Sequence, residues 1–98
     1  MEQQDKIAVE NVNHPGKSRP ADRAMYDAMK KAYLKVLPGK SPGLTPAEIS
    51  ARLSRELPQD LYPGGARAGW WAKTVQLDLE AKGLLRREKT SPVRLFRA

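Results

Sequence analysis

The spacing of apolar residues changes from helical to strand-like at Gly83, and this change constrains the fold more than any other feature of the chain. Residues 66–82 carry apolar side chains at helical spacing, which predicts an α-helix that begins at residue 66 or 67. Gly83 suits the left-handed conformation in which many helices end. Residues 84–87 and 93–97 then alternate with a period near two and predict a terminal β-hairpin. A helix that runs directly into a hairpin predicts an α+β fold.

Two further helices are predicted before this junction. An apolar stripe from Met25 to Val36 predicts the first helix, with Asp22 as its N-cap. The run Thr45-Pro46-Ala47-Glu48 predicts the start of the second helix, because it has the pattern of a capping box. In such a box the threonine and glutamate side chains each accept a backbone N–H at the start of the helix. Prolines at residues 38 and 58 prevent either helix from continuing.

The first 20 residues differ from the helical part of the chain. Apolar alternation at Ile7 and Val9 precedes the turn-forming run 13–18, which predicts an extended N-terminal arm rather than a helix. We therefore expect an arm over residues 1–20 and one small domain over residues 21–98. The arm is expected to pack loosely or onto a partner.

The predicted third helix is apolar on two sides, so it needs to be covered on both. Its core face is marked by Trp71, Val75 and Leu79. Its second apolar stripe comprises Trp70, Leu77 and Ala81. The narrow polar strip between them comprises Lys73, Gln76 and Glu80. The cover is expected to be the N-terminal arm, the first helix or another subunit.

Length and composition limit the class of protein. A chain of 98 residues has room for one domain with one modest core. It has no cysteine, which excludes disulfides, thiolate zinc sites and cysteine nucleophiles. The polar N-terminus lacks the pattern of a signal peptide, and no stretch approaches the ~20 apolar residues that span a bilayer. We therefore expect a cytoplasmic protein with no membrane partner.

Charge gives the first indication of function. Lysine and arginine total 18 against 11 acidic residues, for a net charge of +7. This excess favours an acidic partner such as nucleic acid, although a merely well-solvated surface is the simpler alternative. The excess is concentrated at the end of the chain, where Glu88 is the single acidic residue among five basic ones. These five are Arg86, Arg87, Lys89, Arg94 and Arg97.

Nothing in the sequence predicts an enzyme, a cofactor or a metal site. His14 is the only histidine, and in an Asn-His-Pro-Gly turn it is best interpreted as a turn residue. The serines lack the G-x-S-x-G context of a nucleophile, and a metal site would need more ligands at suitable spacing. Asp78 and Glu80 lie two apart on a predicted helix and so point in different directions, which does not make an acid/base pair.

The order of elements resembles that of a known fold family. Three helices followed by a basic hairpin resemble the winged helix-turn-helix domains of bacterial regulators over about residues 22–97, above all at the junction Leu79-Glu80-Ala81-Lys82-Gly83-Leu84-Leu85-Arg86-Arg87. The chain also resembles a family of small uncharacterised bacterial proteins. That second resemblance rests on the runs Glu10-Asn11-Val12-Asn13-His14-Pro15-Gly16-Lys17 and Gly69-Trp70-Trp71-Ala72-Lys73-Thr74-Val75-Gln76-Leu77-Asp78-Leu79-Glu80-Ala81-Lys82-Gly83.

The winged-helix resemblance implies a fold and a function. The expected fold is a three-helix winged helix-turn-helix with a C-terminal β-hairpin wing and an extended arm. The implied function is binding of duplex DNA by a transcriptional regulator, with the third helix in the major groove and the wing on phosphates. The positions expected to contact DNA are Arg67, Lys73, Thr74 and Gln76 on the helix, and Arg86, Arg87, Lys89, Arg94 and Arg97 on the wing.

Two features favour an alternative function, a protein-interaction or dimerisation module of the same fold. The third helix is neutral from residue 73 to 82, because Asp78 and Glu80 balance Lys73 and Lys82. The connector 58–65 is also longer than in most helix-turn-helix motifs. In this alternative the stripe with Trp70 and Leu77 meets a protein partner or a second copy of the chain.

Trp70 has several interpretations. If it is exposed it marks an interface, and if the arm covers it, it explains why the arm exists. Exposed aromatic residues also stack on unpaired bases in single-strand binders.

Overall fold

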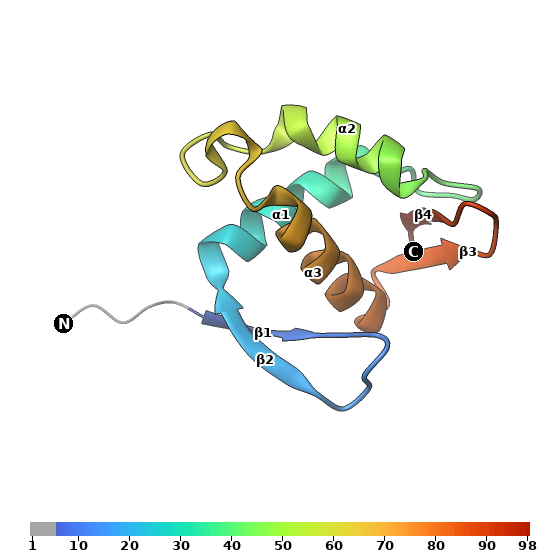
Figure 1. Ribbon diagram of the computed structural model, residues 1–98. Helices are drawn as coiled ribbons and strands as arrows, with labels where there is room; N and C mark the ends of the chain where they lie inside the picture. Colours follow the sequence, from blue (N-terminus) through green and yellow to red (C-terminus); the bar gives the residue numbers. More distant parts are fainter. Residues whose placement is uncertain (1–5) are drawn as a thin grey trace.

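The computed structural model describes residues 6–98 and has an α+β fold with three α-helices and two antiparallel hairpins (Figure 1). The N-terminal hairpin and the helices are β1 (Lys6–Glu10), β2 (Ser18–Asp22), α1 (Arg23–Val36), α2 (Pro46–Glu56) and α3 (Ala68–Ala81). A short 3₁₀ turn (Pro63–Gly65) precedes α3, and β3 (Leu85–Glu88) and β4 (Arg94–Arg97) follow it. This order confirms the three predicted helices and the predicted terminal hairpin. No helix in the described part of the chain is long and apolar enough to cross a bilayer.

The helix ends follow local chemistry, as the sequence predicts. The side chain of Asp22 accepts the Met25 N–H at 3.1 Å at the start of α1. At the start of α2, the Glu48 N–H donates to the Thr45 hydroxyl at 3.2 Å, and the Thr45 N–H donates to the Glu48 carboxylate at 2.9 Å. These bonds from the Thr45 backbone and hydroxyl lower the pKa of Glu48. The predicted capping box is therefore confirmed.

The third helix begins slightly later than expected, because Arg67 has a left-handed φ of 64° and stands outside it. It ends as predicted, with Gly83 at a φ of 76°. The Leu84 N–H then bonds back to the Leu79 carbonyl at 2.9 Å, which satisfies a carbonyl of the last turn. This reversal directs the chain from α3 into β3.

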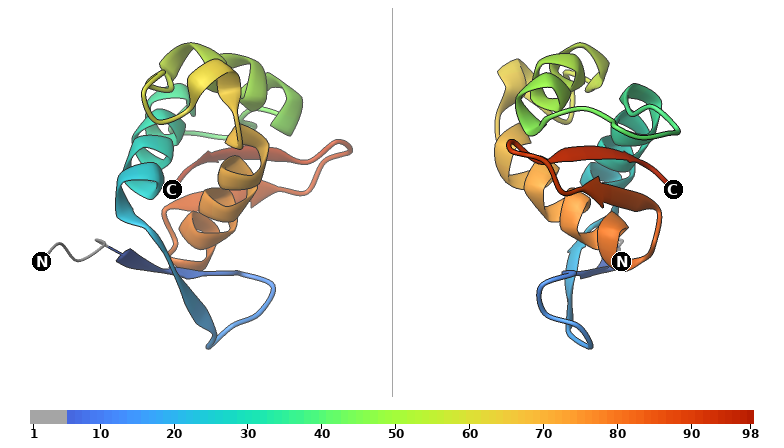
Figure 2. Two further views of the ribbon diagram at one scale, coloured as in Figure 1. Left: turned by 60° about the vertical axis from the view of Figure 1, so that its left-hand side comes forward. Right: turned by 90° about the vertical axis from the view of Figure 1, so that its right-hand side faces the viewer.

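One core lies between the three helices and the two hairpins. Its fully buried side chains come from α1, α2, α3 and β4, and from the connector before α3. The largest of them are Tyr26, Tyr62, Met29, Ile49, Leu79 and Leu95. Val9 and Ala21 of the N-terminal hairpin belong to the same core, so the hairpin packs against the helices of its own chain (Figure 2).

The N-terminal segment is extended, as predicted, but it is a paired hairpin and not a single arm. β1 and β2 pair antiparallel from Lys6↔Asp22 to Glu10↔Ser18, around a turn in which the His14 N–H bonds to the Asn11 carbonyl at 2.9 Å. In Figure 1 this hairpin crosses beneath the C-terminal end of α3. It covers part of the second apolar stripe of α3, where Leu77 is 8% exposed, but it leaves Trp70 of that stripe 53% exposed. Residues 1–5 of the predicted arm lie outside the described residues.

The connection between α1 and α2 joins the C-terminal hairpin, which the sequence did not predict. The Leu44 N–H donates to the Leu95 carbonyl at 2.9 Å, and the Leu95 N–H donates to the Leu44 carbonyl at 2.8 Å. Gly43 has a φ of 84° at this point, and a Cβ there would lie 2.1 Å from the Leu95 carbonyl oxygen. Only glycine lets the two backbones approach so closely.

We expect Gly43→Ala to destabilise the protein by at least ~2 kcal/mol, since about 1–2 kcal/mol of left-handed strain adds to about 1–3 kcal/mol of overpacking. Gly64→Ala is the matched control, because Gly64 has a φ of 62° with open space around its missing Cβ. The control is expected to show the strain alone. Denaturant unfolding of both variants measures the difference, and equal losses would contradict a steric role for Gly43.

Candidate functional site

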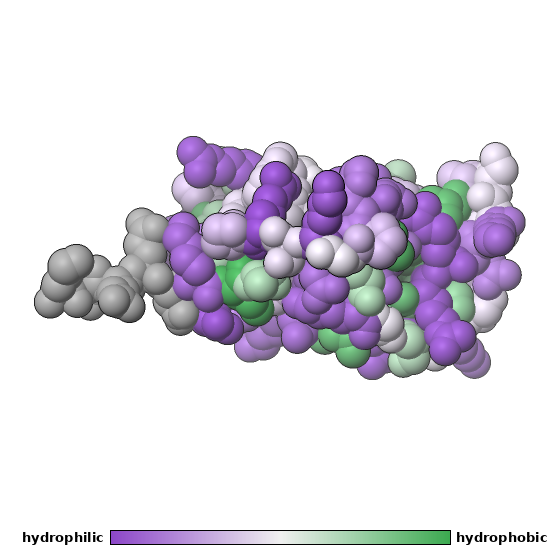
Figure 3. Space-filling model, turned by 90° about the horizontal axis from the view of Figure 1, so that it is seen from below, coloured by the Kyte–Doolittle hydropathy of each residue, from purple (hydrophilic) through white to green (hydrophobic). Residues whose placement is uncertain are grey.

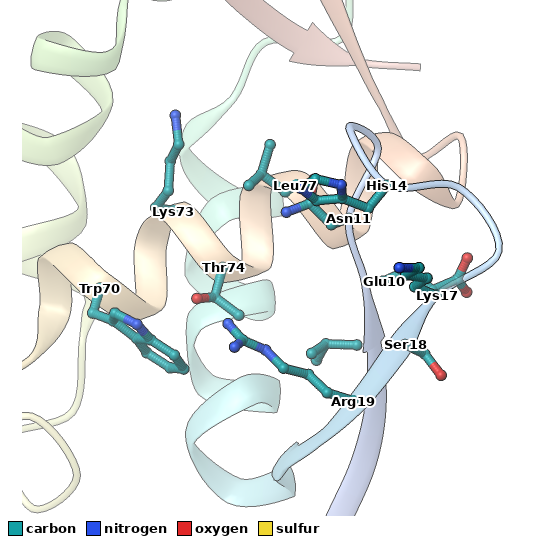
Figure 4. Close-up of a pocket in the computed structure, with 11 residues that line it drawn as sticks. Glu10, Asn11, His14, Lys17, Ser18, Arg19, Trp70, Lys73, Thr74 and Leu77 are labelled. Carbon is teal, nitrogen blue, oxygen red and sulfur yellow. The ribbon is translucent and has the colours of Figure 1, made fainter.

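The N-terminal hairpin and α3 border a groove of ≈ 450 Å³ (Figure 4). The hairpin contributes Asn11, His14, Lys17 and Arg19 among others, and α3 contributes Trp70, Lys73, Thr74 and Leu77. These residues come from the two runs that mark the resemblance to the small bacterial family, apart from Arg19. Folding therefore brings two distant sequence motifs to one surface.

Trp70 is the exposed aromatic residue at this groove. It is 53% exposed, whereas its neighbour Trp71 is 6% exposed and belongs to the core. The two indoles meet edge to face with centroids 5.0 Å apart. The guanidinium carbon of Arg19 lies 5.6 Å from the centroid of the Trp70 ring, within the range of a cation–π contact. In Figure 4 the Arg19 and Trp70 side chains point toward each other beside Thr74.

A second groove of ≈ 490 Å³ lies on another side of Trp70. Lys6 and Arg67 supply its basic side chains, and Asp22 supplies its carboxylate. The Asp22 carboxylate is already engaged as the N-cap of α1. Trp70 therefore borders two grooves, and each of them carries exposed cations.

The acidic residue Asp78 of α3 points into the protein. Its side chain is 0% exposed and accepts the Glu10 N–H at 2.8 Å, the Tyr26 hydroxyl, and the Lys82 ammonium at 2.9 Å. The Lys82 ammonium also lies 5.4 Å from the centroid of the Tyr26 ring. The carboxylate thus links β1, α1 and α3, and its charge is neutralised inside the fold.

Glu80, the other acidic residue of α3, is bound by the C-terminal hairpin. Arg87 donates to it twice, from Nε at 3.0 Å and from Nη2 at 2.9 Å. The hydrogen bond to Glu80 is the main cause that raises the pKa of Arg87, and partial burial of the guanidinium opposes it. Gln76 donates to the same carboxylate at 3.0 Å.

Gln76 is 6% exposed, so the prediction that it lies on an exposed strip of α3 is wrong. It is enclosed because Glu80, and the Tyr33 hydroxyl at 3.5 Å, satisfy its amide inside the protein. Leu77, expected at an interface, is likewise buried within its own chain, at the base of the first groove. Thr74 is half-buried, between these residues and the exposed ones.

The C-terminal hairpin distributes its basic residues over two faces. Arg87 faces α3, where it binds Glu80, so the alternation of side chains along β3 directs Arg86 to the opposite face. Arg94 donates to the Gly43 carbonyl at 3.2 Å and lies 3.5 Å from the Glu48 carboxylate. Arg97 donates to the Leu37 carbonyl at 3.0 Å. These side chains partly hold the hairpin to the helices.

Four of the basic residues predicted to contact DNA are exposed, with side chains that make no hydrogen bond or ion pair to other described residues. These four are Arg67, Lys73, Arg86 and Lys89. Residues 6–98 hold no cluster of three or more side chains suited to a metal ion. Seen from the side of the N-terminal hairpin, hydrophilic residues cover most of the surface and apolar areas are small (Figure 3).

Sequence reasoning missed Lys17 and Arg19 as site residues, because the arm had no predicted position relative to α3. The pairing of β1 with β2 and the bond from the Glu10 N–H to Asp78 give the hairpin that position. The basic character of Lys17 and Arg19, beside a turn, was the signal available.

The chain belongs to a family of unknown function (DUF6958), which matches residues 6–95. The match includes both grooves and nearly all of both hairpins. Neither a curated protein nor a solved structure matches the chain.

We expect Asp78→Ala to destabilise the protein by about 2 kcal/mol or more, because the Tyr26 hydroxyl and the Glu10 N–H each lose their acceptor at about 1–3 kcal/mol. Amide hydrogen exchange should rise most in β1 and β2, which the carboxylate attaches to the helices. Asp60→Ala is the control, since Asp60 is exposed and its loss should cost less than ~0.5 kcal/mol. Unchanged hairpin protection in Asp78→Ala would contradict this attachment.

The three tyrosines predict a loss of stability at alkaline pH. Burial is the main cause that raises the pKa of Tyr26, Tyr33 and Tyr62, and the bond to Asp78 raises the Tyr26 pKa further. The unfolded chain ionises its tyrosines near pH ~10 while the folded chain keeps their protons. Stability is therefore complete below that pH and falls above it. Denaturant midpoints across this range measure the fall, and Tyr33→Phe should make it shallower; an unchanged slope would contradict the assignment.

Proposed function

We propose that this protein is a DNA-binding protein of the winged-helix class and that α3 supplies its recognition surface. The arrangement that supports the class is the order of three helices and a terminal hairpin, together with the pairing of Leu44 with Leu95. That pairing adds the connection between α1 and α2 to the hairpin, which then corresponds to the wing. A net charge of +7 favours a polyanionic partner.

The observation that carries the proposal is the position of the two acidic residues of α3. Asp78 is buried against Lys82 and Tyr26, and Glu80 is bound by Arg87. The neutral balance of this helix in the sequence therefore does not describe its surface. Its exposed N-terminal half presents Lys73, with Arg67 just before the first turn, and no carboxylate of α3 lies there.

The two hairpins flank this half of α3 unequally. Arg87 of the wing is already engaged by Glu80, and Arg86 lies on the face directed away from α3, so Lys89 at the wing tip is the freer wing cation. On the other side, Lys17 and Arg19 of the N-terminal hairpin border the same groove as Lys73. We therefore assign phosphate contacts to Arg67, Lys73 and the N-terminal hairpin first and to the wing second.

One observation favours the alternative, a protein-interaction module, and that is the exposure of Trp70. The other residue expected at such an interface, Leu77, is only 8% exposed, at the base of the first groove, and so has little surface to offer a partner. The two grooves that Trp70 borders are instead lined by five lysines and arginines against two carboxylates, which suits a polyanion better than a second copy of the chain.

Duplex DNA titrations at several salt concentrations test this proposal. Arg67→Gln with Lys73→Gln should weaken binding and make the log–log salt slope shallower by about 1.8, at about 0.9 for each lost phosphate contact. Arg86→Gln with Lys89→Gln should change the slope by no more than that. The control is Lys30→Gln with Lys31→Gln, which removes the same charge from α1. Equal effects of the control and the α3 pair would reduce the interaction to net charge and overturn the assignment of α3.

A further inference from the structure

Trp70 forms a ridge between the two grooves. It lines both of them, is 53% exposed, and meets the buried Trp71 edge to face. Tryptophan is enriched at interfaces, because its ring offers a large flat contact area. Contact with a buried neighbour limits the movement of the Trp70 ring, which favours stacking on a flat partner.

The cations around this ridge lie on both of its sides. Arg19 and Lys17 border one groove, while Arg67 and Lys6 border the other. The carboxylates are fewer, since Glu10 lies in the first groove and Asp22, in the second, is engaged by the Met25 N–H. A ligand that crosses the ridge therefore meets positive charge before and after the aromatic ring.

We propose that this surface binds single-stranded nucleic acid, with one unpaired base stacked on Trp70 and the phosphates on either side of that base bound by Arg19 and Arg67. Bases stack on aromatic side chains in single-strand binders, and cations beside them follow the backbone. This proposal goes beyond the proposed function, because it assigns a single-stranded ligand to the exposed half of α3.

Arg19 is prepared for a phosphate. Its guanidinium is held beside the Trp70 ring by the cation–π contact, and its N–H groups make no hydrogen bond to other described residues. Arginine suits planar, multidentate contact with phosphate oxygens. A base that stacks on this face of the ring takes the place of the guanidinium, which has no hydrogen bond to other described residues to lose and can turn to the adjacent phosphate.

The geometry favours a strand over the other occupants. In a duplex both faces of each base are stacked on neighbours, so Trp70 can reach a base face only where a base is unpaired. A free mononucleotide carries its phosphate on one side of the base, whereas the cations here lie on both sides of the ring. Two copies of this chain meeting at Trp70 would place Arg19 and Arg67 of each copy near those of the other, which like charges disfavour.

The experiment is a fluorescence-anisotropy titration of a dye-labelled short oligothymidylate, which forms no duplex, with the full chain. In the unsubstituted chain, quenching of tryptophan fluorescence by the strand also reports on Trp70, because Trp71 is buried. Trp70→Ala should weaken binding of the oligothymidylate by about 5- to 150-fold, the equivalent of one lost stacking contact. The same substitution should change affinity for a duplex by less than about twofold. Trp70→Phe should restore most of the strand affinity.

Controls separate this proposal from net charge and from the duplex proposal. Arg19→Gln with Arg67→Gln should weaken strand binding more than Lys30→Gln with Lys31→Gln, which carries the same loss of charge. Duplex binding that depends on Lys73, with strand binding insensitive to Trp70, would overturn this inference and leave the proposed function intact. Strand binding that depends on Trp70 without any duplex binding would do the reverse.

Two further results would overturn the inference. One is thymidine monophosphate binding as tightly as the strand, since the cations on the far side of Trp70 would then have no role. The other is a change of mass in light scattering on Trp70→Ala, which would assign the exposed ring to contact between copies of the chain.

Discussion

The buried carboxylate of Asp78 holds together the parts of the structure that carry the site. A charge without exposure is costly unless donors surround it, and here the donors come from β1, α1 and the last turn of α3. The bond from the Glu10 N–H fixes the edge of the N-terminal hairpin against α3. Because β2 pairs with β1 in a single register, the same bond also determines where Arg19 lies relative to Trp70.

This inward charge also explains the unusual composition of α3. The second half of the helix is buried on nearly all sides, including its polar residues Gln76 and Asp78, because the hairpins cover it from two directions. The first half extends beyond that cover and stays exposed on one side, at Trp70 and Lys73. One helix thus contributes to the core at one end and presents an exposed surface, the proposed binding surface, at the other, and a single helical wheel does not distinguish the two ends.

Local signals in the sequence predicted the parts of the fold that depend on local chemistry. The Thr45 capping box, the Asp22 cap and the Gly83 helix end each need residues a few positions apart, and each is confirmed. The pairing of Leu44 with Leu95 and the bond between Glu10 and Asp78, 68 residues apart, depend on tertiary packing instead. Of the candidate site, Lys73 was predictable from its helical position, whereas Arg67 was predicted in the helix but stands just before it.

The remaining site residues were not predictable for a related reason. The amide of Gln76 can be buried only where other residues satisfy its hydrogen bonds. Tyr33 and Glu80 do so here, and no local rule predicts that they lie beside it. Lys17 and Arg19 belong to a segment whose position no local rule sets. Helical spacing therefore predicted which side chains share a face of α3, but not which of those side chains are exposed to solvent.

The arginines of the two hairpins differ in how many of their N–H groups lack an acceptor in the protein and can therefore bind a phosphate. Arg87 directs Nε and Nη2 at a carboxylate 2.9–3.0 Å away, so a phosphate would have to displace an existing charge-assisted pair. Arg19 is held only by the face of an indole, a contact that leaves its N–H groups available. The concentration of positive charge at the C-terminal end of the sequence therefore does not indicate which cationic side chains lack a partner in the folded protein. Folding uses Arg87, Arg94 and Arg97 to attach the C-terminal hairpin, and it leaves Arg19 of the N-terminal hairpin beside the exposed ring.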